Sequence, residues 1–517
     1  MNNSSRVAKS QYNFIFSLMN NLVVTILGFV TRTVFVHSLG TSYLGLNGLF
    51  TNVLSLLSLA ELGVGSAITF SLYKPIAEHN DEKIKSLMRL YKRAYQIIGW
   101  VIFGVGTALT PFLKYIVNLD AGVEINYYVI YYMFLLNSVV SYWFFAYRSV
   151  IVYANQEGYI LTKIETIFAL IRSFAQFFVL IAFRNFYIYQ ALPIIIGILK
   201  NIIISNVAGK KYPIINEKNA KPLDSVETKG IFKNVFALSL FKISAVVYGA
   251  TDNIIISTWL GTNVVGLVSN YTMITQMVST YVNMIFQSMY ASVGNLNATE
   301  TDDYKFLVFR RLNLLNFWIY CYCTICLGCF LNPCIKVWLG EAYCLKTSTT
   351  ILLALVFLVP GLNNVINIYK DACGLFKEVQ YRAVATAVIN LGTSIVLVRK
   401  IGLNGVFIGT IVAYFTTIYQ VDPRIVFNKI FKRTATEYYH ILVKQFALFS
   451  VLFLIMYVLS QIICISGWGS LILCFILISV LVNAILICIF RKTDEYLYLK
   501  KILLSMLIGI KKQRNRR

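Results

Sequence analysis

The chain has 517 residues, of which 58% are hydrophobic and only 13% are charged, and it contains 8 prolines. This composition excludes a soluble globular protein with one core and indicates a protein that crosses a membrane many times. The formal net charge of +24 would suit nucleic-acid binding. The basic residues are, however, spread over many polar segments without an aromatic-interleaved patch, so we expect no nucleic-acid partner.

Apolar runs of membrane-spanning length recur along the whole chain, and each can cross the ~30 Å hydrocarbon layer as a helix. No small-residue cleavage site follows the first run, which therefore predicts a retained span and not a signal peptide. The expected fold is an all-α integral membrane protein. We predict fourteen transmembrane helices, at residues 12–37, 43–73, 94–117, 127–153, 160–183, 187–208, 231–259, 263–293, 306–331, 347–369, 380–398, 403–421, 441–463 and 468–490.

Lysine and arginine are distributed unevenly between the two sides of this predicted topology. An even number of spans places both termini on one side, and 37 of the 46 basic residues, Lys200 included, fall in segments on that side. Six fall in the opposite loops and three within spans. Because loops rich in Lys and Arg remain cytoplasmic, we predict that both termini are cytoplasmic. The same basic surface is expected to attract anionic membrane lipids.

Two parts of the sequence repeat each other. The segment LGTSYLGL at 39–46 returns as LGTNVVGL at 260–267. Further matches at nearly the same spacing predict an internal duplication. They pair Pro111 with Pro333, Arg148 with Lys370, and Tyr159 with Tyr381. Each copy holds six spans, so the two lobes should share one orientation, as in transporters with parallel repeats.

This duplication predicts the organisation of the chain. The segment 209–230 is the longest polar connection and has two prolines and five lysines, which is typical of a linker. The tail has too short an apolar run to cross the membrane, and its basic residues favour a helix on the inner surface. We predict an N-terminal lobe at 1–208, a cytoplasmic linker at 209–230, a C-terminal lobe at 231–430, two appended spans at 431–490 and a basic cytoplasmic tail at 491–517.

No catalytic or metal-binding motif is visible. The chain has three histidines, no Walker-type phosphate loop and no zinc-protease motif. Six of its ten cysteines lie between 321 and 344, but Cys321 and Cys323 would point about 200° apart on one helix. We therefore expect no enzyme activity, no cofactor and no metal site.

Charged residues inside the predicted spans are the candidates for function. Arg172 and Lys242 should lie near the membrane midplane, where a lone cation costs ~2.5 kcal/mol or more. Glu61 and Glu165 are possible partners for them. Arg32 lies in span one.

Asp252 occupies nearly the place in the repeat that Arg32 occupies in the first copy. Arg148 and Lys370 lie at the cytoplasmic ends of spans four and ten, where they either frame an inward-open mouth or extend to the interface. All these charges could instead pair between helices and only fix the packing. An excess of cations in a cavity favours an anionic ligand such as a phosphate diester or pyrophosphate.

Several segments resemble one bacterial transporter family. They are Ala60-Glu61-Leu62-Gly63, Thr251-Asp252-Asn253 with Leu260-Gly261-Thr262, Gly374-Leu375-Phe376, and Asn390-Leu391 before Gly402-Leu403-Asn404-Gly405. The chain is similar in these segments and in its fourteen spans to the bacterial polysaccharide-transporter family, the flippases of O-antigen and capsule repeat units. That family belongs to the superfamily that also holds multidrug-and-toxin extruders and lipid II flippases.

The resemblance implies a flippase in the bacterial cytoplasmic membrane that moves an undecaprenyl-diphosphate-linked oligosaccharide to the outer leaflet by alternating access. Arg32, Arg172 and Lys242 would then line a cationic cavity, with Arg148 and Lys370 at its mouth. It also implies H⁺ or Na⁺ as a coupling ion, with Glu61, Glu165 and Asp252 as candidate carriers. A polysaccharide polymerase is an expected partner, and a monomer is the expected state.

Three alternatives remain. A multidrug exporter would need an acidic cavity for cationic drugs, which the basic excess in the spans opposes. A peptidoglycan-precursor (lipid II) flippase is the second alternative. A membrane polymerase would need a large extracytoplasmic loop, and the longest predicted outside loops are only those at 118–126 and 332–346.

Overall fold

The computed structural model describes residues 3–58, 64–119, 125–217, 221–224, 227–231, 251–287, 289–375, 377–463, 465–502 and 504. Every regular element within these ranges is a helix, which confirms the predicted all-α class. By their contacts the residues divide into two units, Met1–Gly266 and Leu267–Arg517. We describe each unit by itself. The predicted boundaries of lobes, linker and tail remain predictions.

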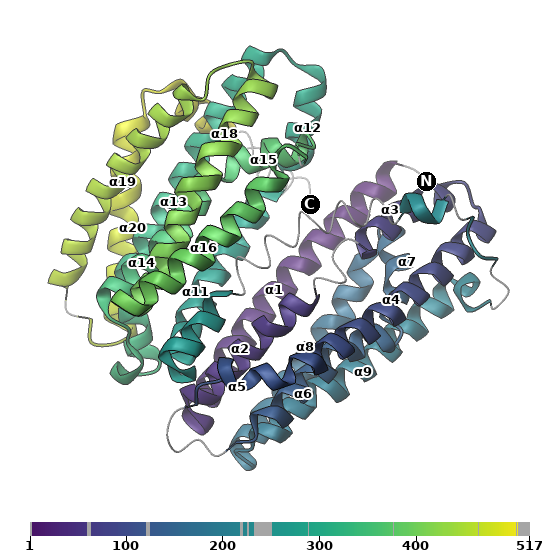
Figure 1. The fold of residues 1–517 in the computed structure, drawn as a ribbon. Coiled ribbons are helices and arrows are strands. Elements are labelled where there is room, and N and C mark those ends of the chain that lie inside the picture. The colour runs from purple at the N-terminus through teal and green to yellow at the C-terminus, as the bar shows by residue number, and fades with distance from the viewer. Residues whose placement is uncertain are drawn as a thin grey trace, which may run out of the picture. The chain divides into compact units, whose positions relative to one another are not determined.

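The first unit is a bundle of long helices that pack against one another. α8 packs against α1 and α9, α6 against α9 and α4, and α3 against α4 and α7 (Figure 1). A further helix covers residues 251–260. The bounds are α1 (Asn3–Leu39), α2 (Thr41–Leu57), α3 (Val64–Ala77), α4 (Asp81–Leu109), α5 (Leu113–Ile116), α6 (Tyr127–Trp143), α7 (Ser149–Ala154), α8 (Gly158–Ala182) and α9 (Phe186–Lys211), with 3₁₀ turns η2 (Thr110–Phe112), η3 (Ala146–Arg148) and η4 (Pro213–Asn216).

Asparagine fixes where three of these helices begin. The side chain of Asn80 accepts a hydrogen bond from a backbone N–H in the first turn of α4, and Asn126 and Asn185 do the same for α6 and α9. Such caps satisfy N–H groups that have no partner within the helix. The chain therefore re-enters a helix at a defined residue after each connection.

The second unit repeats this packing order. α14 packs against α13 and α17, α16 against α17, and α12 against α15, while α13 also contacts α19 and α20 (Figure 1). The bounds are α11 (Thr262–Gln287), which begins in the first unit, α12 (Met289–Thr299), α13 (Asp302–Trp338), η5 (Glu341–Tyr343), α14 (Thr347–Leu362), α15 (Asn364–Ala372), η6 (Lys377–Val379), α16 (Gln380–Ile401), α17 (Leu403–Ala413), η7 (Tyr414–Ile418), α18 (Tyr419–Val426), η8 (Phe427–Phe431), α19 (Thr436–Ile462) and α20 (Trp468–Phe490).

Three pairs of equivalent helices begin at a spacing that is constant to within a single position. The first residues are Thr41 and Thr262 for α2 and α11, Asp81 and Asp302 for α4 and α13, and Gly158 and Gln380 for α8 and α16. The packing order of α4, α6, α9 and α8 is that of α13, α14, α17 and α16. Both observations support the predicted parallel duplication, in which α19 and α20 have no counterpart in the first copy.

Nine helices within the described residues are long and apolar enough to cross a membrane, or ten when a bent pair counts as one span. In that pair, Tyr127–Trp143 meets Ala146–Ala154 at 45°. The chain is a multi-pass membrane protein. Ten of the fourteen predicted spans coincide with these helices, and the other four are 43–73, 231–259, 263–293 and 403–421. The first two run into residues outside the described ranges, α11 is rich in polar residues, and α17 is separated from α18 by a π-helical turn.

The described part of the tail forms a helix at 494–502 that is fixed to α13. Glu495 pairs with Arg310 at 2.5 Å, and the ring of Tyr496 stacks on Trp318 with 6.0 Å between centroids. The tail thus begins as part of the second unit. Its predicted position on the inner surface remains a prediction.

Candidate functional site

Two of the predicted cavity cations lie around one tyrosine in the first unit. The Tyr189 hydroxyl on α9 interacts electrostatically with both Arg32 of α1 and Arg172 of α8. Arg32 is half-buried and Arg172 is exposed. The Tyr189 ring is itself buried and packs edge-on against Phe35, with centroids 5.0 Å apart. Three helices therefore bring two guanidinium groups toward the same region.

The predicted counter-charge for Arg172 has a different neighbour. Glu165 lies on α8 as predicted, but it interacts electrostatically with Lys200 of α9 and with Tyr153. Arg172 has no carboxylate within 4.0 Å among the described residues. The interpretation of Glu165 as its partner is therefore wrong for the described structure.

Lys200 is a charged residue of this region that the sequence analysis missed. We counted it with the cytoplasmic segment that follows, yet it lies near the middle of α9 and is half-buried. The long apolar run around it was the available signal. Arg32 of α1, Arg172 and Glu165 of α8, and Lys200 of α9 together make three cations and one carboxylate, so positive charge is in excess among them.

The other predicted site residues of the first unit are scattered. Arg148 lies in η3, at the break between α6 and α7, and is half-buried. Asp252 lies within the helical residues 251–260 and is also half-buried. Glu61 and Lys242 lie outside the described residues, so their placement stays a prediction.

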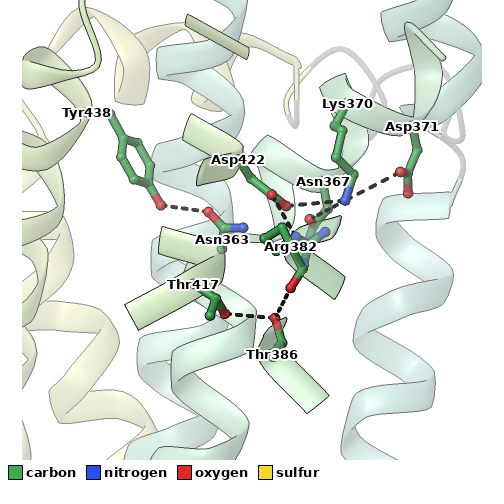
Figure 2. A network of polar contacts seen from close by, with 9 residues as sticks. All are labelled: Asn363, Asn367, Lys370, Asp371, Arg382, Thr386, Thr417, Asp422 and Tyr438. Carbon is green, nitrogen blue, oxygen red and sulfur yellow. Dashed lines mark hydrogen bonds and ion pairs between the residues drawn. The ribbon is translucent and has the colours of Figure 1, made fainter. Parts of the chain in front are cut away.

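The second unit contains a buried ionic cluster that the sequence analysis identified only through Lys370 (Figure 2). The Lys370 ammonium lies 3.4 Å from Asp422 Oδ2 and 3.7 Å from Asp371 Oδ1, and it donates to Asn367 Oδ1 at 3.0 Å. Arg382 Nε lies 3.1 Å from Asp422 Oδ1. Two cations and two carboxylates give this cluster no formal net charge.

Burial shows that this cluster is internal. Lys370 is 3% exposed and Asp422 is 0% exposed. The interpretation that Lys370 extends to the membrane interface is therefore wrong. Charges this deeply buried require partners, because an unpaired one would be strongly destabilising. The cluster joins α15, α16 and α18, and the cancellation of its charges leaves little attraction for an anionic substrate.

The helix that presents Asp422 is irregular on both sides of it. π-helical turns at Tyr414–Ile418 and Phe427–Phe431 flank α18. Pro423 lies next to Asp422 and has no N–H to donate to the carbonyl of Tyr419. That carbonyl accepts a hydrogen bond from the Tyr439 hydroxyl at 2.9 Å instead. The irregularity is thus compensated, and such turns occur frequently at functional sites.

Polar side chains extend the cluster toward the break between α14 and α15. Asn363 at this break is fully buried and accepts a hydrogen bond from the Tyr438 hydroxyl at 3.0 Å (Figure 2). Thr386 shares a 2.7 Å hydrogen bond with Thr417 and donates to the Arg382 carbonyl at 2.9 Å. The contacts of Thr386 fix the backbone around Arg382.

One ion pair occurs in both copies of the repeat. Glu157, just before α8, lies 2.6 Å from Lys211 at the end of α9. Its equivalent in the second copy is Glu378, just before α16, which lies 2.5 Å from Lys429 in η8. In the first unit Tyr212 also donates to Glu157 at 2.7 Å, and burial together with this hydrogen bond raises the pKa of the Tyr212 phenol. Each copy therefore closes the same pair of helix ends with the same charges.

No group of three or more His, Cys, Asp or Glu side chains is arranged to hold a metal ion within the ranges that the structure describes. Five cysteines of the 321–344 group lie on α13.

The fold has been found in solved transporters. No protein-family model matches the chain, and no curated protein sequence matches it. A lipid II flippase MurJ in an inward closed conformation matches with a TM-score of 0.62 and 16% identity, over 92% of this chain and 99% of that one. An inward-facing multidrug resistance MATE family transporter of the MOP superfamily matches with a TM-score of 0.60 and 15% identity, over 80% and 98%. A mutant of the Vibrio cholerae MATE transporter VcmN matches with a TM-score of 0.56 and 12% identity, over 83% and 100%. At these identities the likeness shows the fold alone, which is that of MATE and MurJ transporters.

Proposed function

We propose that the chain is a flippase that moves an undecaprenyl-diphosphate-linked oligosaccharide from the cytoplasmic to the outer leaflet of the bacterial cytoplasmic membrane by alternating access. The product would feed capsule, O-antigen or exopolysaccharide synthesis. In this proposal the chain is not an enzyme, because the reaction changes the position of the lipid and breaks no bond.

The observation that carries the proposal is the excess of cations on α1, α8 and α9 of the first unit. Arg32 and Arg172 interact with the same tyrosine, and Arg172 has no carboxylate within 4.0 Å in the described part of the chain. An arginine at membrane depth is costly unless an anion or water satisfies it. A diphosphate matches this requirement, because each guanidinium can donate two parallel hydrogen bonds to its oxygens.

The solved relatives support transport of this general kind. One of the matched structures is a lipid II flippase, so a lipid-linked substrate is a closer analogy for this chain than a free drug. The MurJ structure also covers 92% of this chain, whereas the two MATE structures above cover 80% and 83%. The positive excess further opposes a cavity for cationic drugs.

Several finer points of the proposal come from the sequence alone. We propose that Lys242 joins Arg32 and Arg172, and that both termini are cytoplasmic. H⁺ or Na⁺ would supply the energy, with Glu61 and Asp252 as candidate carriers. For Glu165, the interaction with Lys200 supports a packing role better than ion coupling.

Deletion of the gene followed by analysis of lipid-linked glycans at the inner leaflet tests the proposal. We expect an undecaprenyl-diphosphate oligosaccharide to accumulate and wild-type protein to clear it. Arg172→Gln should clear it poorly at normal protein abundance, and Arg172→Lys should recover part of the activity. Normal clearance by an Arg172→Gln, Lys242→Gln double variant at wild-type abundance would contradict the cavity assignment.

A second candidate is a lipid II flippase, which the coverage of the MurJ structure favours. Lipid II also carries a diphosphate, so the cations would serve equally well. The same deletion separates the two, because accumulation of lipid II without any other lipid-linked glycan would replace the first candidate by the second.

A further inference from the structure

The two copies of the repeat use an equivalent cation in different ways. Lys370 corresponds to Arg148 at the same spacing that relates α16 to α8, and both residues follow the break in an interrupted span. Lys370 is paired with Asp422 and Asp371. Arg148 has no carboxylate within 4.0 Å among the residues that the structure describes. One copy therefore neutralises this cation internally and the other does not.

The backbone in front of Arg148 is strained. Phe145 has φ 60° and ψ 8°, a left-handed conformation that a bulky residue rarely adopts. Such conformations are energetically costly and are concentrated at active sites and ligand-binding sites. Here the strain turns the chain from α6 into η3, and the Arg148 guanidinium lies over the Phe145 ring at 5.7 Å.

The absence of a side chain at Gly209 lets Arg148 and Asn216 approach α9 closely. A Cβ atom built on Gly209 would lie 3.3 Å from Arg148 Nη1, 2.9 Å from Asn216 Oδ1 and 3.2 Å from Asn216 Nδ2. Arg148 and Asn216 thus converge on one point above α9. Asn216 donates one amide hydrogen to the Gly209 carbonyl at 3.0 Å, and its amide has a second hydrogen to donate.

The carboxylate just before α8, that of Glu157, interacts with residues other than Arg148. Glu157 lies 2.6 Å from Lys211 and accepts a hydrogen bond from Tyr212 at 2.7 Å. Within the described residues, Arg148 itself is held only by a long 3.4 Å hydrogen bond to the Tyr147 hydroxyl and by its ring contact. Its guanidinium therefore keeps donors for an external anion.

We propose that Arg148 and Asn216, which meet over Gly209, form a phosphate-binding site for an anionic lipid headgroup. A guanidinium and an amide are donors that phosphate oxygens take. The site lies at the end of the first unit where α8 begins and α9 ends, the predicted cytoplasmic side. Its substrate identity rests on the proposed function: the lipid is either the translocated diphosphate lipid or a resident anionic phospholipid.

Binding measured through thermal stability of the purified full chain in detergent tests this site, because a ligand that binds the folded state raises the melting temperature. The probes are undecaprenyl diphosphate, phosphatidylglycerol, and inorganic pyrophosphate without a lipid. We expect Arg148→Gln to weaken binding of the best probe about ten-fold or more, the scale of one lost charge-assisted contact. Arg148→Lys should lose less.

Lys210→Gln is the matched control, because Lys210 is exposed on the same helix end and its replacement removes the same charge. It should bind like the wild type. Gly209→Ala should weaken binding without removing any charge, because its Cβ would displace the side chains of Asn216 and Arg148. Tighter binding of undecaprenyl diphosphate than of phosphatidylglycerol identifies the translocated lipid as the ligand. Equal binding of the two lipids identifies a resident phospholipid. Either result supports the existence of the site.

Three results would overturn the site. They are unchanged affinity in Arg148→Gln, an equal loss in Lys210→Gln, and no effect of any probe on the wild type. Failure of the proposed function looks different, because deletion of the gene would then leave every lipid-linked glycan at its normal level while binding of phosphatidylglycerol still depended on Arg148.

Discussion

Gly45 of α2 and Gly266 of α11 make a reciprocal backbone contact. A Cβ atom built on either glycine would lie 3.2 Å from the backbone nitrogen of the other. The carbonyls of Thr262 and Thr41 would be closer still to these Cβ atoms, nearer than real Cβ atoms approach. Thr41 also donates a hydrogen bond to Asn263. Since Gly45 and Gly266 are equivalent positions of LGTSYLGL and LGTNVVGL, the two repeated segments present the same backbone to each other.

Gly45→Ala should therefore destabilise the protein, because the added methyl group would overpack this contact at a cost of about 1–3 kcal/mol. The melting temperature of purified protein in detergent is the measurement. Gly104→Ala is the control, since nothing lies within 4 Å of that Cβ and alanine is the better helix former by about 1 kcal/mol. Gly45→Ala, Gly266→Ala should cost less than the two single changes together, because both act on one contact. A Gly45→Ala protein that melts at or above the wild type would contradict the close approach.

Asp422→Asn should destabilise the second unit by about 3–5 kcal/mol, because it leaves Lys370 and Arg382 buried without their shared carboxylate. Lower protein abundance and melting temperature should report the loss. Lys370→Met combined with Asp422→Leu should cost less than Asp422→Asn alone, since one cation leaves with the carboxylate. Arg382 then retains an interaction with Asp371.

The matched control is the surface pair of Arg433 and Asp303, in which Asp303 is 88% exposed. Asp303→Asn should change stability by at most about 1 kcal/mol. If Asp422→Asn behaved like Asp303→Asn, the cluster would not be a buried ionic core.

The repeated ion pairs should differ in strength. The side chain of Glu157 is 12% exposed, whereas that of Glu378 is 27% exposed and more screened by solvent. Double-mutant cycles with Gln at both positions should give a larger coupling energy for Glu157 and Lys211 than for Glu378 and Lys429. We expect about 0.5–1 kcal/mol for the more exposed pair. A larger coupling energy for Glu378 and Lys429 would show that the hydrogen bond from Tyr212, and not burial, determines how strongly Glu157 couples to Lys211.

The orientation of the chain can be tested by labelling. Asn219→Cys and Asn118→Cys, each in a cysteine-free background, should react from opposite sides of the membrane. A membrane-impermeant thiol reagent added to intact cells should label only Asn118→Cys, because the basic-residue distribution places the segment with Asn219 inside. Labelling of Asn219→Cys from outside would reverse the predicted topology.

The regular features of the fold could be predicted because they leave signals in the sequence. Apolar length predicted the spans, and the return of LGTSYLGL as LGTNVVGL predicted where α11 begins relative to α2. Arg32 and Arg172 were predicted as cations of one region, and the structure brings both to Tyr189. The tyrosine itself gave no signal, because a residue that assembles a site by packing looks like any other aromatic in an apolar run.

The interaction partners of the charged residues and the exact ends of the helices could not be predicted from the sequence, for physical reasons. The predicted span 403–421 ends just before Asp422. The helix continues, however, since Tyr439 satisfies the carbonyl that Pro423 leaves open. Lys200 lies within the predicted span 187–208 and within α9, and only its charge placed it with the cytoplasmic residues. In both places polarity indicates where a helix meets solvent or partners, and not where its hydrogen bonds end.

The reciprocal glycine contact has an evolutionary consequence. Residue pairs that exchange roles across the contact, Gly45 with Thr262 and Gly266 with Thr41, are the signature of an isologous interface between identical subunits. A half-length ancestor carrying one copy of LGT-x-x-x-GL could have dimerised through this surface before its gene was duplicated and fused. After fusion the two copies were free to diverge. In the second copy Lys370 is paired with carboxylates, whereas in the first copy the equivalent Arg148 has no carboxylate within 4.0 Å among the described residues.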